Sequence, residues 1–330
     1  MKVAVFSTKS YDIEFFNKFN DSIHSFTFFE AALNKNTTKL SEGYDAVCVF
    51  VNDKIDRKTI EKLAENGVKL IVLRCAGFNN VDLKAANQNN IKVYRVPAYS
   101  PNAIAEHALA LILTLNRKTH KAYNRIRENN YSLDKLTGFN LNEKTIGVIG
   151  TGKIGAVFCT IMKGFGCKII AYDLYEDPKL KEIGVTFLSL DELYKQSDII
   201  SLHCPLTPET KHLIDKEAFL KMKDGVMLIN TSRGAVIDTK AAIRALKIGK
   251  LGYLGIDVYE QEEHLFFQDL SESIIQDDII ARLMSFPNVL ITAHQGFFTN
   301  EALAQIVKIT LQNIFNFENG IETNCEIKID

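Results

Sequence analysis

Short apolar runs alternate with amphipathic stretches along nearly the whole chain, a pattern typical of parallel sheets with crossover helices. The runs fall into two series, each of which predicts a set of strands. The first series comprises Val3–Phe6, Phe26–Phe29, Ala46–Phe50, Leu70–Leu73 and Lys92–Tyr94. The second comprises Thr145–Ile149, Lys168–Tyr172, Ile199–His203, Val226–Asn230, Tyr253–Ile256 and Val289–Thr292. The pattern therefore predicts an α/β fold with two parallel-sheet domains.

A buried helix is predicted between the two series. Ser100 is a good N-cap and Pro101 suits the first helical position. The stretch from Ala108 to Leu113 is apolar on almost every side, which indicates a helix covered by protein. We interpret this helix, which runs on to Arg117, as the link from the first domain to the second. A helical stretch from Glu301 to Phe317 would return the chain to the first domain.

The composition favours a small molecule as the binding partner. The 330 residues are 46% hydrophobic and 24% charged, with a net charge of −1. Such a balance gives no broad basic surface for nucleic acid or an anionic membrane. No apolar run approaches the roughly 20 residues that span a bilayer, and the first residues already form a strand pattern instead of a signal peptide. We therefore expect a cytoplasmic protein that binds neither nucleic acid nor membrane.

The cysteines predict neither a metal site nor a disulfide framework. No CxxC pair and no Cys/His cluster with metal-ligand spacing occurs. Several of the cysteines stand in apolar runs, where a thiol behaves as a small core side chain. The six are Cys48, Cys75, Cys159, Cys167, Cys204 and Cys325.

A glycine-rich turn carries the sharpest local signal. The segment Gly150-Thr151-Gly152-Lys153-Ile154-Gly155 follows a predicted strand and opens a helix that reaches about Lys163. Its glycines allow a tight turn and close approach of a pyrophosphate to the helix N-terminus. About twenty positions later the next strand ends on Asp173, whose carboxylate suits the ribose hydroxyls of NAD and would repel the 2′-phosphate of NADP. The context predicts an NAD site.

Polar and turn-forming residues follow every strand of the second series. In open parallel sheets, ligands bind at the carboxyl ends of the strands, so we expect these residues to line one crevice. Arg233 could form a bidentate pair with a substrate carboxylate, although a structural ion pair is the alternative. The strand-end positions are Gly150–Gly155, Asp173, Cys204-Pro205, Thr231-Ser232-Arg233, Asp257 and His294.

His294 is the candidate acid–base residue, because imidazole exchanges protons near neutral pH. A lone histidine is more often structural, but the segment Asp257–Glu262 offers carboxylates that could orient this one. Spacing does not decide which carboxylate faces it. The remaining histidines are interpreted as structural or solvated, with some reserve for His203: His24, His107, His120, His203, His212 and His264.

With these residues in view, the chain resembles the D-isomer-specific 2-hydroxyacid dehydrogenases over nearly its whole length. Within that family it is most similar to the fermentative D-lactate dehydrogenases, through Glu262–Asp269 and its continuation to Asp278. The other segments that carry the resemblance are Val96–His107, the Gly150–Gly155 loop, His203–Thr207, Asn230–Gly234 and Gly255–Glu260.

The resemblance implies a Rossmann NAD-binding domain, residues 100–296, inserted into a flavodoxin-like substrate domain made of 1–99 and 297–330. Both domains would be doubly wound parallel sheets. The substrate pair would be pyruvate and D-lactate, and relatives form homodimers or homotetramers.

The resemblance also implies roles for individual residues. Arg233 would hold the substrate, His294 would exchange the proton and Glu262 would keep His294 protonated for reduction. Further cofactor contacts would come from Lys153, Ile154, Cys204, Pro205, Thr210, Thr231, Ser232, Arg233 and Asp257. Position 210 departs from the asparagine that relatives often carry. Further substrate contacts would come from Ala76, Gly77, Tyr99 and Phe297, the two aromatic residues having core packing as the alternative.

Two other functions stay open. A sister enzyme for bulkier D-2-hydroxy acids, of the isocaproate type, would differ by a few wall residues, because one methylene changes selection by only about 1–3 kcal/mol. An NADH-sensing corepressor-like protein would need no catalytic residues, so the joint presence of Arg233, Glu262 and His294 argues against it. Glu262, where formate dehydrogenases have glutamine, disfavours that branch. The lactate-branch segment disfavours a phosphoglycerate or glycerate enzyme.

Overall fold

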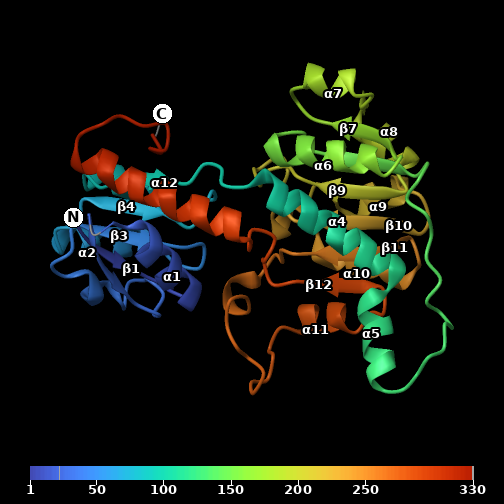
Figure 1. The fold of residues 1–330 in the computed structure, drawn as a ribbon, viewed down its shortest axis with the longest axis horizontal. Helices are drawn as coiled ribbons and strands as arrows, with labels where there is room; N and C mark the ends of the chain where they lie inside the picture. Colours follow the sequence, from blue (N-terminus) through green and yellow to red (C-terminus); the bar gives the residue numbers. More distant parts are fainter. Residues whose placement is uncertain (22, 329–330) are drawn as a thin grey trace. The chain divides into compact units, whose positions relative to one another are not determined.

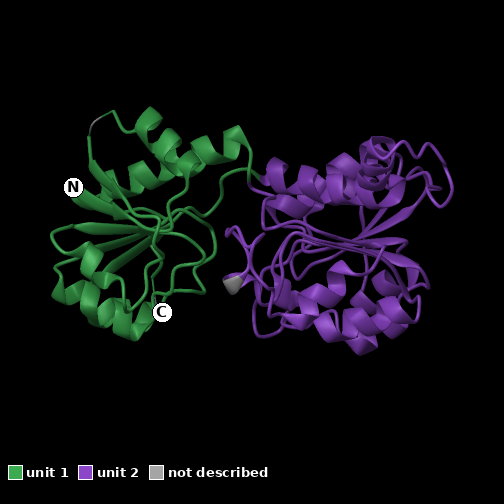
Figure 2. Ribbon diagram, turned by 90° about the horizontal axis from the view of Figure 1, so that it is seen from below, with its two compact units in different colours: residues 1–100, 298–330 green, residues 101–297 purple. Residues whose placement is uncertain are grey.

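The chain divides into two compact units in a computed structural model, which describes residues 1–21 and 23–328 and leaves the side chain of His264 aside. Unit 1 is Met1–Ser100 with Phe298–Asp330, and unit 2 is Pro101–Phe297 (Figure 2). Each unit has one parallel sheet with helices on both faces. The expected α/β fold class is confirmed.

Unit 1 has a five-stranded sheet in the order β2-β1-β3-β4-β5. All neighbouring strands are parallel, and they start or end within one residue of the predicted apolar runs. The strands are β1 Lys2–Val5, β2 Ser25–Phe28, β3 Ala46–Val49, β4 Leu70–Leu73 and β5 Lys92–Arg95. The helices are α1 Ser10–Phe19, η1 Thr38–Ser41, α2 Arg57–Glu65, α3 Leu83–Gln88 and α12 Asn300–Glu318 (Figure 1).

The last helix returns to unit 1, as the sequence predicts. α12 packs against α1 and β4, and its buried Asn313 donates from Nδ2 to the carbonyl of Arg95 at 2.9 Å. The following segment runs antiparallel beside β5, where the amide of Ile327 donates to the carbonyl of Val93 at 2.8 Å. Residues far apart in the sequence therefore complete one unit.

Unit 2 has a seven-stranded sheet in the order β12-β11-β10-β9-β6-β7-β8. The strands are β6 Thr145–Ile149, β7 Lys168–Tyr172, β8 Thr186–Phe187, β9 Ile199–Leu202, β10 Val226–Asn230, β11 Leu251–Ile256 and β12 Val289–Ile291. The prediction missed β8, because two residues are too few to form a pattern. It also began β11 two residues late, at Tyr253 instead of Leu251.

The helices of unit 2 cover both faces of its sheet (Figure 2). They are α4 Pro101–Arg117, α5 Thr119–Arg127, α6 Lys153–Gly164, α7 Pro178–Glu182, α8 Leu190–Gln196, α9 Lys216–Lys221, η2 Gly234–Val236, α10 Thr239–Lys247, η3 Glu262–His264 and α11 Asp278–Met284. The predicted linking helix, α4, packs on α6, β10 and β11 with most of its apolar residues buried. Gly255 on β11 permits this contact, since a Cβ there would lie only 3.0 Å from Leu115.

Candidate active site

The glycine-rich turn joins β6 to α6 as the sequence predicts. Gly150 has φ +91°, and a Cβ on it would lie 2.6 Å from the amide nitrogen of Cys204. A Cβ on Gly155 would collide with the carbonyl oxygen of Gly150. Only glycine fits these two positions, because one needs a left-handed backbone and both lie against neighbouring backbone atoms.

The start of α6 fits a bound pyrophosphate. Gly152 is its N-cap, so no side chain caps the helix, and no described atom lies within 4 Å of where its Cβ would be. Uncapped amide groups and open space at a helix N-terminus are what a phosphate requires. Lys153 and Ile154 form the first turn behind it. The residues present here fit the dinucleotide that the motif implies.

A buried hydroxyl at the carboxyl end of β10 also lacks a protein partner among the described residues. Thr231 directly follows β10 and is 9% exposed, and among the described residues its Oγ1 has no hydrogen-bond partner. Buried hydroxyls are rarely left unsatisfied. This atom is therefore suited to a contact with a bound molecule.

Asp173 follows β7 at the predicted position, beside the glycine-rich turn. Its Oδ2 accepts hydrogen bonds from the amide and the hydroxyl of Thr151 at 2.5 and 3.0 Å, and its Oδ1 accepts from the amide of Tyr175 at 3.1 Å. Burial alone would raise the pKa of Asp173, but these hydrogen bonds outweigh it and lower the pKa. The carboxylate is thus held ionised, which opposes a 2′-phosphate.

The loop after β9 contains Cys204, Pro205 and Thr210. Cys204 is buried, and burial raises the pKa of its thiol to about 11, so no reactive thiolate forms there. The hydroxyl of Thr210 donates to the carbonyl of Pro205 at 2.6 Å and accepts from the amide of Thr207 at 2.8 Å. Thr210 therefore folds its own loop.

Arg233 extends from a turn that Asn230 holds together. The side chain of Asn230 donates to the carbonyl of Arg233 at 2.9 Å and accepts from the amide and hydroxyl of Ser232 at 3.0 and 2.8 Å. Within the described residues, the guanidinium donates only to the neighbouring carbonyl of Ser232, at 2.6 Å. Its other N–H groups are available for a carboxylate, and no structural ion pair occupies them.

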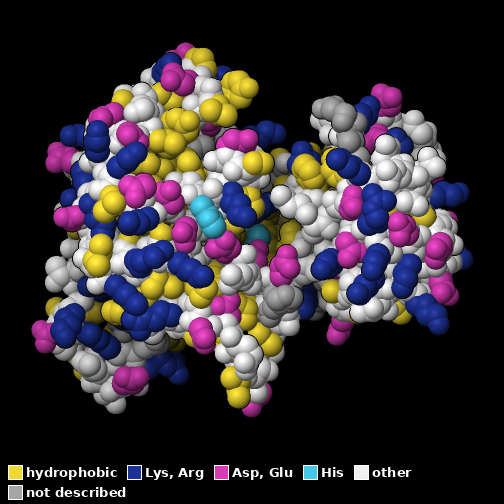
Figure 3. Space-filling model, turned by 180° about the vertical axis from the view of Figure 1, so that it is seen from behind, with side chains coloured by type: hydrophobic (Ala, Val, Ile, Leu, Met, Phe, Trp, Pro, Cys, Tyr) yellow, Lys and Arg dark blue, Asp and Glu magenta, His cyan; other side chains and the backbone are white. Residues whose placement is uncertain are grey.

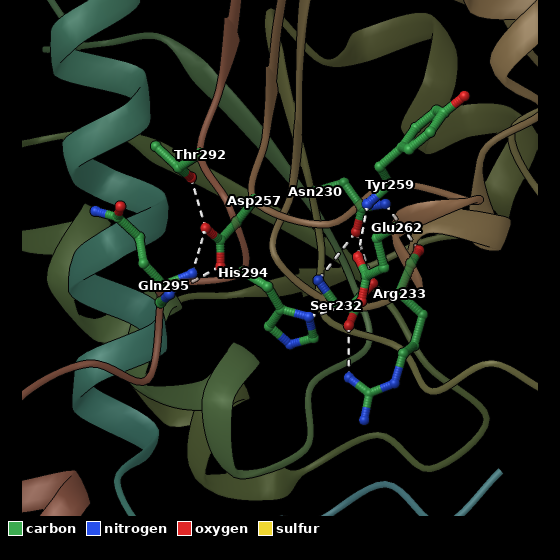
Figure 4. Close-up of polar contacts among 10 residues, drawn as sticks. Asn230, Ser232, Arg233, Asp257, Tyr259, Glu262, Thr292, His294 and Gln295 are labelled. Atoms are coloured by element: carbon green, nitrogen blue, oxygen red, sulfur yellow. Dashed lines mark hydrogen bonds and ion pairs between the residues drawn. The ribbon is translucent and has the colours of Figure 1, made fainter. Parts of the chain in front are cut away.

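His294 pairs with Glu262, which decides between the carboxylates that spacing left open. The Nδ1 of His294 lies 2.8 Å from Oε1 of Glu262, and Oε2 of Glu262 accepts from the amide of Tyr259 at 2.9 Å. Both carboxylate oxygens are therefore fixed. Figure 4 shows the imidazole and the guanidinium of Arg233 extending from neighbouring turns on the same side of the sheet end. The pair can exchange a proton through Nε2 of His294 with a substrate held by Arg233.

Asp257 does not face the imidazole. It is 2% exposed at the end of β11, and its carboxylate accepts from Thr292 Oγ1 and the amide of Gln295 (Figure 4). It also accepts from the amide of Gly296 and from Nε2 of His107. Burial alone would raise the pKa of Asp257, but the hydrogen bond and charge of His107, with the other donors, lower it to about 2.

Two side chains that the sequence does not single out support the pair. The ring of Phe267 lies 5.8 Å from that of His294, and both residues have left-handed backbones, with φ +63° and +52°. The hydroxyl of Tyr259 donates to Asp277, the N-cap of α11, at 2.8 Å. No local motif marks such contacts, because their partners are set by the path of the chain after β11.

The predicted substrate contacts in unit 1 lie on the segment after β4 and before α4. Among the described residues, no acceptor is seen for the amide groups of Ala76 and Gly77, while the carbonyl of Ala76 accepts from Arg95 at 3.0 Å. Tyr99 is half-buried in unit 1. Phe297 is buried at the end of unit 2.

The described residues hold neither a metal-ligand cluster nor a membrane-spanning helix. No group of three or more His, Cys, Asp or Glu side chains there could hold a metal ion. None of the helices within the described ranges is long and apolar enough to cross a membrane.

Comparison with known proteins agrees with this geometry. The family model described as D-isomer specific 2-hydroxyacid dehydrogenase, NAD binding domain, matches residues 109–296. D-lactate dehydrogenase of Escherichia coli strain K12 is 53% identical over 321 residues, covering 97% of this chain and 98% of its own.

Solved structures extend the likeness to the fold. The apo-structure of D-lactate dehydrogenase from Escherichia coli has a TM-score of 0.92 and 50% identity, over 99% of this chain and 100% of that one. D-lactate dehydrogenase from Aquifex aeolicus, complexed with NAD and lactic acid, has a TM-score of 0.86 and 37% identity, over 96% of each chain. Unit 2 is an NAD-binding domain, and the chain belongs to the D-isomer specific 2-hydroxyacid dehydrogenases.

Proposed function

We propose that the protein is an NAD-dependent D-lactate dehydrogenase, which reduces pyruvate to D-lactate with NADH and catalyses the reverse oxidation. The observation that carries the proposal is the His294–Glu262 pair at 2.8 Å beside the unpaired guanidinium of Arg233, on an NAD-binding unit. The half-identical D-lactate dehydrogenase of Escherichia coli supports lactate as the hydroxy acid.

Each residue of the trio has a separate task in this proposal. NADH, when bound, supplies the hydride that C2 of pyruvate accepts. Arg233 binds the substrate carboxylate through its planar fork and fixes the orientation of the C2 carbonyl. Nε2 of His294 gives its proton to the carbonyl oxygen, and the carboxylate of Glu262 stabilises the positive charge of the imidazolium before transfer. Oxidation of D-lactate returns the proton to Nε2.

Unit 2 would hold the cofactor through three groups of residues. The turn at Gly150, Gly152 and Gly155, with Lys153 and Ile154, would bind the pyrophosphate, and Asp173 the adenosine ribose. The segment Thr231–Arg233 offers the unsatisfied Oγ1 of Thr231 to the nicotinamide end. Cys204, Pro205 and Thr210 would line the path between them. Asp257 would contribute to cofactor binding indirectly, by fixing the turn at Thr292–Gly296, since its carboxylate already accepts from four donors.

Ala76, Gly77, Tyr99 and Phe297 stay predicted substrate contacts. Substitution of Tyr99 or Phe297 by leucine should change the ratio of kcat/KM between pyruvate and a bulkier 2-oxo acid. A ratio unchanged in both variants would count against these assignments.

One assay tests the proposed function. The purified protein is mixed with NADH and a panel of 2-oxo acids, and the chirality of each product is determined. We expect turnover of pyruvate to D-lactate, with little use of NADPH. Faster turnover of 2-oxoisocaproate than of pyruvate would favour the bulkier hydroxy acid, and NADH binding without any oxidation would favour a sensor.

Location and assembly stay predictions of the sequence: a cytoplasmic enzyme, as a homodimer or homotetramer. On the face shown in Figure 3, Lys and Arg side chains are mixed with Asp and Glu, without a continuous basic surface. Helix α5 and the segment after it expose Tyr123, Ile126, Tyr131 and Leu133, which offer apolar area to a second copy. Light scattering of the purified protein and of its Ile126→Glu variant measures the oligomeric state. A smaller mass for the variant would place this apolar surface in the interface.

A further inference from the structure

The carboxylate of Asp257 fixes the turn that carries His294. Thr292 donates its hydroxyl proton to Oδ1 at 2.5 Å, the amide of Gln295 donates to Oδ1 at 2.9 Å, and that of Gly296 to Oδ2 at 2.8 Å. The backbone amide of His294 donates to the carbonyl of Asp257 at 2.7 Å. One residue therefore binds the chain before, at and after His294.

This turn needs such support because its backbone is strained. His294 has φ +52°, a left-handed conformation that costs a residue with a Cβ free energy and persists only where the surroundings impose it. Gly296 allows the carboxylate to approach, since a Cβ there would lie 3.0 Å from Oδ2 of Asp257. The position of the imidazole thus depends on the position of the Asp257 carboxylate.

His107 is the one side chain from another element that reaches this carboxylate, within the described residues. It lies on α4, and its Nε2 is 3.2 Å from Oδ1 of Asp257 and 3.0 Å from Oγ1 of Thr292. Because Thr292 gives its proton to Asp257, its oxygen can only accept, which assigns the proton to Nε2 of His107. Contact of α4 with β11, allowed by Gly255, places His107 at the end of that strand.

We propose that His107 is a positioning residue for proton transfer: through Asp257 it holds the left-handed turn that presents His294. This inference rests on the proposed function. His107 acts through another carboxylate and does not pair with His294, whose Nδ1 is bound to Glu262. Asp257 is the charged group that faces His107 at ion-pair distance in the described part of the chain.

The structure separates this role from binding of the pyrophosphate and the adenosine ribose of the cofactor. The glycine-rich turn is held by contacts among Gly150, Gly155 and Cys204 and by the pairing of Thr151 with Asp173, and none of these involves His107. Removing the imidazole should therefore lower kcat more than it weakens NADH binding. It should also move the acid limb of the pH profile upward, because Asp257 would lose the partner that most favours its ionised form.

The test compares His107→Leu and His107→Gln with the parent enzyme, and Ala110→Ser, at an exposed position of the same helix, is the control. With pyruvate and NADH, we expect kcat of His107→Leu to fall about 10- to 100-fold, the range typical of residues that orient metal-ligating side chains. The Kd of NADH, measured by its fluorescence, should change less than about threefold. His107→Gln, which keeps an N–H donor, should recover most of kcat at neutral pH.

Each outcome supports or overturns the inference. The inference is overturned if kcat of His107→Leu is within twofold of the parent or if the acid limb of its pH profile is unchanged. It is also overturned if the substitution weakens only NADH binding. If His107→Leu does not fold, His107→Asn takes its place, because its shorter amide cannot reach Asp257. A parent enzyme that oxidises NADH with no 2-oxo acid overturns the proposed function and this inference together, whereas an active parent with an equally active variant overturns the inference alone.

Discussion

Replacing Asp257 by asparagine tests how much the buried carboxylate contributes to stability. The pKa of Asp257 is about 2, against an ordinary value of 3.8, so the native state favours the ionised form by about 1.8 pH units. At about 1.4 kcal/mol per unit, the ionised carboxylate contributes about 2–3 kcal/mol at pH 7. Asparagine would lose this contribution. Its NH2 group would also face the amide of Gly296, which now donates to Oδ2.

The sign of the pH dependence follows from the lowered pKa. The contribution is complete well above the unfolded pKa of about 4 and is lost as the pH falls toward the folded pKa of about 2. Between pH 7 and pH 3, the parent should lose about 1 kcal/mol of this contribution, and Asp257→Asn none of it. The difference in stability between the two proteins should therefore shrink as the pH falls.

Urea unfolding without cofactor measures both effects. The chain has no tryptophan, so circular dichroism at 222 nm is the better probe, and the transition of unit 2 is followed separately if the two units unfold in two steps. We expect Asp257→Asn to be about 2–4 kcal/mol less stable at pH 7, after adding about 1 kcal/mol for the unpaired amide. Asp224→Asn, whose partner Lys250 binds it at the surface, is the control. A loss below about 0.5 kcal/mol, or a difference that grows toward pH 3, would show that the ionised carboxylate of Asp257 does not stabilise the fold.

The remaining predictions concern turnover. His294→Gln should lower kcat by at least about 1000-fold while the fluorescence titration with NADH stays nearly unchanged; a near-normal rate would reject His294 as the acid. Arg233→Lys should raise KM for pyruvate and lower kcat/KM at least about tenfold, because the planar fork is lost, and an unchanged KM would contradict its role as carboxylate anchor. Asp173→Ala should raise kcat/KM with NADPH relative to NADH, measured side by side, and an unchanged ratio would show that this carboxylate does not select the cofactor.

The strands and the cofactor turn could be predicted because their signals are local. A parallel strand covered on both faces is a continuous apolar run, and ten of the eleven predicted strands lie within one residue of the observed ends. The turn at Gly150–Gly155 is recognisable in the sequence by its glycines. They are required because a Cβ added at Gly150 or Gly155 would collide with neighbouring backbone atoms. The two-residue strand β8 is too short for such a run. The start of β11 was missed because a glycine there interrupts the apolar pattern.

The supporting contacts of the site could not be predicted, because each joins segments that only the folded chain brings together. His107 stands in an apolar helix and looks structural in the sequence, yet its partner is Asp257, 150 positions away. Gly234 looks like an ordinary turn glycine, but a Cβ there would collide with the backbone at Tyr259 and Glu260. The glycine therefore lets the Arg233 turn pack directly against the segment that leads to Glu262. The sequence therefore points to the proposed reacting residues by their type and their position at strand ends. Close packing between the turns at the strand ends holds these residues in place. That packing depends on glycines, which have no side chain, as much as on the side chains that make contacts.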